Sequence, residues 1–173
     1  MRRTRAAGLI ALCVACAPNP GDLAFRRATE GAPDVAGREL ERLVSEAVDD
    51  IAWQLAPSPA ICLSTLGEDP SPKLLGAIKA DVVTPRSECP PTYARALVFT
   101  DSSGTPNYPE RPEGYVDPLG LDFIGVWVDQ GEVWYFRFRY SQGAGGWYYW
   151  CPIPDEPGSH SGVACEKRGG WIA

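Results

Sequence analysis

Residues 121–151 carry the densest apolar pattern of the chain and predict three consecutive strands. Eleven of the 18 aromatic residues lie here, in runs at 121–129, 132–140 and 147–153. In the middle run, aromatic residues alternate with a second set of side chains, which is typical of a strand with one buried face. The residues predicted to face the core are Trp134, Phe136, Phe138 and Tyr140. Turn sequences rich in glycine separate the runs, so we expect an antiparallel meander.

A helical pattern precedes these strands. From residue 34, apolar residues recur at three- and four-residue steps, which is typical of an amphipathic helix. They are Leu40, Leu43, Val44, Ala47, Val48, Ile51 and Leu55. Asp34 is the predicted N-cap, and Pro57 and Pro59 end the helix. This apolar stripe needs a sheet to cover, and the aromatic meander is the candidate.

A strand-helix-strand unit is predicted between the helix and the meander. Residues 60–65 form the first strand and residues 81–85 the second. Between them, Ser71 is the predicted N-cap of a short helix and Pro72 its first residue, a position that tolerates proline because its amide needs no helical partner.

The order of elements predicts an α+β fold, with the N-terminal amphipathic helix and the strand-helix-strand unit packed on the antiparallel β-meander. A further strand is predicted at 94–100, and Trp171 lies in a terminal edge strand or a docked tail. A helix followed by a meander, with Gly-Gly-Trp at 145–147 and 169–171, is similar to the nuclear-transport-factor-2-like and cystatin-like families. The likeness covers the predicted single domain, residues 34–173, without a diagnostic motif, and it implies a curved sheet around a helix.

The chain begins with an export signal. Three arginines precede an apolar run at 6–15 that is too short to span a bilayer, so residues 1–15 are predicted to be a signal peptide. The sequence Leu-Cys-Val-Ala-Cys at 12–16 resembles the lipobox of bacterial lipoproteins, with Cys13 where that pattern prefers leucine. The resemblance implies a lipid on Cys16, which becomes the first residue after cleavage. Ordinary cleavage, giving a freely secreted or periplasmic protein, and a retained uncleaved anchor are the alternatives.

Residues 16–33 are predicted to be the lipidated cysteine and a flexible linker, because the segment is rich in proline and glycine. The implied partner is a membrane, through several acyl chains that together anchor stably. Ala17 and Pro18 lack the acidic signal associated with inner-membrane retention, so the resemblance implies a cell-envelope protein of the outer membrane.

Four cysteines remain in the predicted domain: Cys62, Cys89, Cys151 and Cys165. An even number in an exported chain predicts disulfides, and three pairings are open. We favour pairing the first with the second and the third with the fourth, because each pair then closes a compact unit. A zinc site is disfavoured, since there is no C-x-x-C motif and only one histidine.

Charge and missing motifs exclude several functions. The formal net charge is −6 and becomes −9 when the three arginines of the leader are removed. An acidic chain repels phosphate backbones, so no nucleic-acid partner is expected. Phosphate-binding, dinucleotide and metalloprotease motifs are absent, and no cofactor or metal is predicted. His160 lies between two serines but does not match a nucleophile elbow. The proline-rich segment 105–120 is a surface crossover or a recognition loop.

Three functional hypotheses remain. The first is a non-catalytic binding module for a protein or small-molecule partner, with no catalytic residue assigned, that uses residues on the sheet face opposite the core. This candidate binding face comprises Tyr135, Arg137, Arg139, Tyr148 and Trp150. The second is a pocket hydrolase or isomerase that pairs Asp122 or Asp129 with Tyr135 or Tyr140, because acids beside aromatic strands can have raised pKa values. The third is a structural envelope lipoprotein.

Overall fold

The structure is a computed structural model of the chain. It describes residues 18–33, 39–57, 60–90, 99–100, 106–107, 113, 116–131, 133–142, 145–154 and 163–172. The described helices are α1 (Pro20–Ala28), α2 (Leu40–Gln54), α3 (Pro72–Ala77) and a short 3₁₀ helix at Arg86–Glu88. The described strands are β1 (Ile61–Thr65), β2 (Val83–Pro85), β3 (Phe99–Thr100), β4 (Pro106–Asn107), β5 (Leu119–Asp129), β6 (Val133–Gln142), β7 (Gly145–Pro152) and β8 (Glu166–Ile172).

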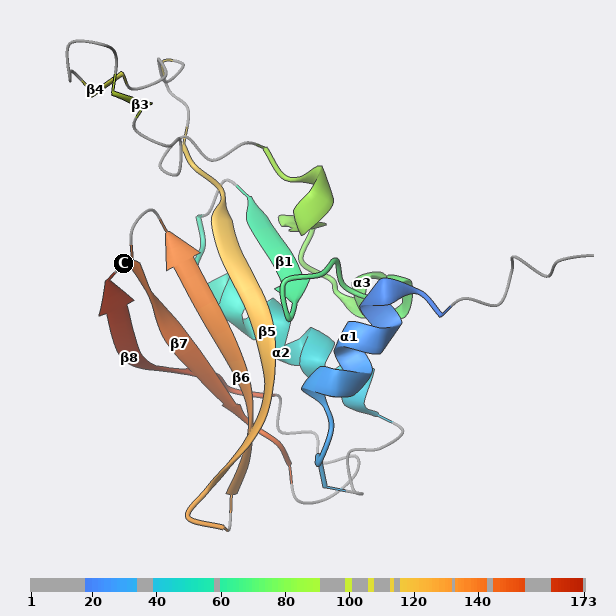
Figure 1. Cartoon of the computed structure of the whole chain (residues 1–173). Helices are drawn as coiled ribbons and strands as arrows, with labels where there is room; N and C mark the ends of the chain where they lie inside the picture. Colours follow the sequence, from blue (N-terminus) through green and yellow to red (C-terminus); the bar gives the residue numbers. More distant parts are fainter. Residues whose placement is uncertain are drawn as a thin grey trace, which may run out of the picture.

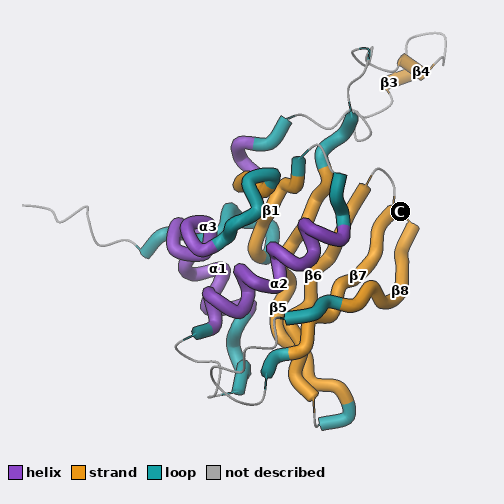
Figure 2. The backbone as a smooth tube through the Cα atoms, turned by 180° about the vertical axis from the view of Figure 1, so that it is seen from behind, coloured by secondary structure: helices purple, strands orange, loops and turns teal. Residues whose placement is uncertain are grey.

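A mixed sheet of six strands organises the fold, in the order β2-β1-β5-β6-β7-β8. Strand β1 runs parallel to β2 and β5, whereas β5 to β8 form antiparallel pairs. The three α-helices lie on one face of this sheet, as the two opposite views show (Figures 1 and 2). The predicted α+β class and the antiparallel meander are therefore confirmed. Strands β3 and β4 pair only with each other among the described strands.

The core lies between the helices and the meander. Phe136 and Phe138 of β6 are fully buried, and Tyr140 is 4% exposed. Trp134, the fourth residue predicted for this face, is half-buried and packs against the edge of the core. From the helix α2, the buried residues of the predicted stripe are Leu43, Val44, Ala47, Val48 and Ile51, with Leu40 and Leu55 at its margins. The apolar stripe of α2 and the buried aromatic residues of β6 therefore belong to one hydrophobic core. The proposed N-cap Asp34 lies outside the described residues.

The strand-helix-strand unit is correct in its elements and wrong in its placement. Ser71 caps α3, accepting a hydrogen bond from the Leu74 amide at 3.1 Å, and Pro72 is the first helical residue. However, β1 and β2 do not pack on the meander, because β1 hydrogen-bonds to β5 in register and extends the same sheet. The helix α3 then joins the other helices on the covered face (Figure 2).

The predicted flexible linker at 16–33 is wrong for half of its length. Residues 20–28 form the helix α1, which begins with Pro20 after the cap Asn19, whose side chain accepts from the Gly21 amide at 2.8 Å. Phe25 is 7% exposed, with its ring centroid 6.0 Å from that of Phe123. Gly21 packs so closely that a Cβ there would lie 2.6 Å from the carbonyl oxygen of Asp69. The helix α1 is thus part of the folded domain.

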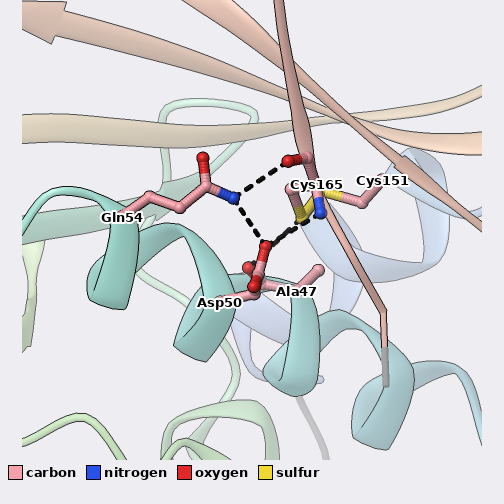
Figure 3. Close-up of a disulfide and its surroundings, with 5 residues drawn as sticks. All are labelled: Ala47, Asp50, Gln54, Cys151 and Cys165. Atoms are coloured by element: carbon pink, nitrogen blue, oxygen red, sulfur yellow. Dashed lines mark hydrogen bonds between the residues drawn. A yellow bond between two sulfur atoms is a disulfide. The ribbon is translucent and has the colours of Figure 1, made fainter. Parts of the chain in front are cut away.

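Both favoured disulfides are present, Cys62–Cys89 and Cys151–Cys165. The first closes the unit formed by β1, α3 and β2. The second joins β7 to the residue preceding β8, next to α2 (Figure 3). There Asp50 accepts hydrogen bonds from the Cys165 amide at 2.8 Å and from Gln54 at 2.7 Å, and Gln54 also donates to the Cys165 carbonyl at 2.9 Å. The helix α2 is thereby fixed to the start of the last strand.

Candidate functional site: an arginine among aromatic rings on the open face

The candidate site lies on the face of the sheet that the described helices leave uncovered. Side chains alternate between faces along a strand, so the residues between the buried aromatics of β6 point away from the core. Register places Arg137 of β6 beside Trp150 of β7, and Arg139 beside Tyr148. Tyr135 lies on the same face. All five residues of the candidate binding face are therefore neighbours, and none of their three rings is fully buried.

Arg137 is the centre of this group. Its guanidinium carbon lies 5.0 Å from the ring centroid of Trp150, 5.2 Å from that of Trp127 and 5.3 Å from that of Tyr148. Such contacts between a cation and the negative faces of rings contribute roughly 0.5–2 kcal/mol each, depending on desolvation. Across the strand pair, Arg137 lies opposite Gly125. The rings therefore hold the guanidinium in place.

The same guanidinium has no carboxylate partner among the described residues. Its Nε atom is buried and without a hydrogen-bond partner, and a ring face satisfies such an N–H donor only weakly. Because Nε is shielded from solvent, an acceptor supplied from outside would meet the terminal nitrogens of this partly buried side chain.

The two other arginines of this face differ, because each has a carboxylate partner. Arg139 donates to Asp122 at 3.0 Å. Arg168 of β8 hydrogen-bonds to Glu166 at 2.9 Å and lies 3.9 Å from Asp129. Its hydrogen bond to Glu166 raises the pKa of Arg168 above its ordinary value, so this group stays charged. Arg137 is the exception of the three.

Arg168 and Trp127 belong to the cluster, although the sequence did not indicate them. Arg168 lies 5.2 Å from the ring centroid of Tyr135 and 5.4 Å from that of Trp150. The Trp127 ring is 6.4 Å from that of Trp150, nearly perpendicular to it, and the residue is 49% exposed. We call the six residues at these contacts the outer cluster: Trp127, Tyr135, Arg137, Tyr148, Trp150 and Arg168.

A β-bulge explains why alternation missed Trp127. Leu121 and Phe123 face the core, and strict alternation would place Trp127 there too. The register of β5 against β6 shifts between Phe123 and Gly125, so Val126 then pairs with Phe136 and packs on the core. Gly125 has φ +132°, a conformation that residues with side chains rarely adopt. A glycine inside a strand is the sequence signal for such a bulge, after which alternate residues change faces.

Of the residues proposed for a pocket enzyme, Asp122 and Tyr140 lie on opposite faces of the sheet, whereas Asp129 and Tyr135 both lie near Arg168. Asp122 is buried and already accepts from Ser64 at 2.8 Å, from the Gly67 amide at 3.0 Å and from Arg139. Tyr140 lies on the core face, opposite to the face of Asp122, and its hydroxyl donates to Gln142 at 2.9 Å. Asp129 is an exposed carboxylate at a strand end, the situation that argues against an acid-base role.

Other elements of the sequence analysis fall outside the described residues, namely His160, Cys16 and half of the proline-rich segment 105–120. Within the described part of the chain, no group of three or more histidine, cysteine, aspartate or glutamate side chains is arranged to hold a metal ion. No helix among the described residues is both long and apolar enough to cross a membrane.

Comparison of the chain with protein-family models, with curated proteins and with solved structures finds no match. A functional proposal for this chain therefore depends on the geometry of the outer cluster.

Proposed function

We propose that this protein is a non-catalytic binding module of the cell envelope, anchored by a lipid on Cys16, that engages its partner through the outer cluster. The observation that carries the proposal is the arrangement on the open sheet face, where partly exposed rings surround an arginine that has no carboxylate partner among the described residues. Tyrosine, tryptophan and arginine are the residue types most enriched in binding hot spots. Contiguous aromatic surface is uncommon on soluble domains without a partner.

The proposed anchor rests on the lipobox resemblance. The helix α1 shortens the expected distance between the anchored cysteine and the folded domain. Folded structure begins at Pro20, only four Cα steps after Cys16. Four steps span at most about 14 Å. The anchored domain would therefore lie next to its membrane instead of standing clear of it. Since α1 packs on the helical face, the outer cluster would be on the side of the sheet turned away from α1 (Figure 1).

The anchor is tested with two matched cysteine substitutions in a bacterial host. Cys16→Ser should move the protein from the detergent phase to the aqueous phase in a phase-separating detergent and remove the acyl mass from its N-terminal peptide. Cys13→Ser, three residues earlier, should leave both properties unchanged. Partitioning of unsubstituted protein into the aqueous phase after cleavage would instead support the freely secreted alternative.

The binding role is tested without knowing the partner, by oxidative footprinting of tryptophan in intact cells and in purified protein. We expect Trp127 and Trp150 to be oxidised more slowly in cells, where the partner covers them. The cells carry the Cys16→Ser variant, so that no membrane lies against the helical face, and Trp53 on α2, which is 78% exposed on that face, is the internal control. Equal oxidation rates in cells and in solution at all three residues would contradict the proposal.

A further inference from the structure

We infer that the ligand of the outer cluster is an acidic polysaccharide, bound through a sugar ring that carries a carboxylate. The inference rests on the proposed binding role of this face and names its ligand class. It starts from the electrostatic difference between the three arginines. Arg139 and Arg168 have internal carboxylates, whereas Arg137 has none among the described residues. An external anion would give Arg137 the negatively charged partner that the other two arginines have within the protein.

The chemistry of Arg137 selects the kind of anion. The guanidinium is a planar group with five donors that matches the two oxygens of a carboxylate or phosphate. Nε is buried, so an anion from solvent would meet the terminal nitrogens of this partly buried guanidinium, which has no carboxylate partner among the described residues. A bare inorganic anion would pair with them but would leave the surrounding rings exposed. The ligand should therefore place an anionic group directly beside a surface that can cover aromatic rings.

A sugar acid has this combination in one residue. The C–H groups on the face of a pyranose ring carry partial positive charge and pack against the negative face of an aromatic ring. Trp127 offers the most exposed ring of the cluster, and the Arg137 guanidinium lies 5.2 Å from its centroid. A sugar stacked on Trp127 could therefore direct a ring carboxylate to Arg137. Trp150 and Tyr135, with centroids 5.5 Å apart, extend the aromatic surface across the next strands for neighbouring sugars.

Charge argues against a nucleic acid on the same rings. Aromatic residues on a sheet also stack nucleobases, but nucleic-acid sites combine them with a track of cations along the phosphate backbone. Here one arginine has no acid partner among the described residues and two are paired with carboxylates, so the described part of this face offers no continuous track of free cations. A single local cation suits a carboxylate attached to an uncharged ring.

The probe is an oligomer of galacturonic acid, with its methyl ester as control, because the two share every sugar ring and differ in the carboxylate charge. Binding to the purified full protein, with both disulfides formed, is followed by tryptophan fluorescence and by calorimetry. We expect saturable binding of the acid and about tenfold or greater weakening for the ester, the range for one charge-assisted hydrogen-bonded pair.

Two arginine variants separate the site from general charge effects. Arg137→Gln should weaken binding of the acid about tenfold or more and leave the weak binding of the ester unchanged. Arg42→Gln removes the same charge from the exposed surface of α2 and should bind like the unsubstituted protein. Circular dichroism melting confirms that each variant is folded. If Arg137→Gln does not fold, Trp127→Ala on the half-exposed ring provides the second test, with the same expected loss.

Three results would overturn the inference: no binding of the acid, equal binding of acid and ester, or equal binding by Arg137→Gln and Arg42→Gln. Polyglutamate, which offers carboxylates without sugar rings, distinguishes the remaining ligand class. Binding of polyglutamate as tightly as of the acid would assign the site to an acidic protein segment instead. In that case footprinting would still show the outer cluster covered in cells, so the binding role would stand while the ligand class failed.

Discussion

Replacing Phe25 with alanine tests whether α1 is docked on the domain. The proposed distance between membrane and domain depends on this docking. A nine-residue helix is not stable by itself in water, so its order must come from docking. Phe25 is the largest buried side chain of α1, and it contacts Phe123 in the core. Core phenylalanine truncations cost about 3–5 kcal/mol. Because α1 lies at the periphery and can relax into the space, we expect about 2–3 kcal/mol.

The assay combines urea unfolding, followed by tryptophan fluorescence, with hydrogen exchange of the α1 amides. A loss of about 2–3 kcal/mol lowers the urea midpoint by roughly 1 M. If α1 detaches alone, the midpoint moves less and the α1 amides exchange faster. Leu23→Ala on the exposed side of the same helix is the control, with less than about 0.5 kcal/mol expected. Phe25→Ala that matches Leu23→Ala in both measurements would refute the docking of α1.

Three further predictions follow from the core and the sheet. Asp122→Ala should lower the free energy of unfolding by about 3 kcal/mol, because the donors that now bond to this buried carboxylate lose their acceptor. The control Asp129→Ala, at the exposed strand end, should cost less than about 0.5 kcal/mol. Equal urea midpoints for the two variants would contradict this prediction. Replacing Cys151 and Cys165 together with serine should cost about 3 kcal/mol, since the bond closes a short loop, and thermal melting under non-reducing conditions measures it. Burial raises the pKa of Tyr140 above its ordinary 10.0, so the unfolded chain releases this proton first and stability should be constant below about pH 10 and fall above it. The free energy of unfolding of Tyr140→Phe should fall less steeply between pH 9 and 11 than that of the unsubstituted protein. Parallel stability curves for the two proteins would contradict the raised pKa of Tyr140.

Local signals predicted much of the fold because they agree with the tertiary structure. The alternation in β6 identified which aromatics are buried, and Ser71 and Pro72 fixed the start of α3. The disulfide pairing followed from the compactness of the units that each bond closes. In these regions periodicity, capping and chain connectivity all indicate the same structure.

The helix α1 was missed because its proline and glycine resemble linker residues. In the structure both have helical roles. Pro20 occupies the first helical position, where a missing amide costs nothing, and Gly21 allows close contact with the loop before α3. Composition cannot distinguish these roles from a flexible tether, because the contact partner Asp69 lies far along the chain.

The candidate site was only half predictable, for a different reason. Alternation along β6 and β7 identifies residues that share a face, which gave the five residues of the candidate binding face. It does not show which charges neutralise one another across strands. Arg139 pairs with Asp122, and Arg168 reaches Asp129 from the far edge strand, so only the structure identifies Arg137 as the arginine without a carboxylate partner among the described residues. Nor does alternation predict the bulge in β5 that brings Trp127 to the cluster.

The position of α1 and the position of Arg137 together constrain how an anchored protein would work. With Cys16 lipidated, the short connection to Pro20 would hold the helical face near the lipid, and the outer cluster would face outward on the other side of the sheet. A site in that orientation cannot bind a headgroup of its own membrane without turning the domain, which a connection of about 14 Å restricts. It is instead accessible to polymers beyond the membrane surface. With the proposed anchor in place, this orientation would favour an external polymer over a lipid headgroup as the ligand of Arg137.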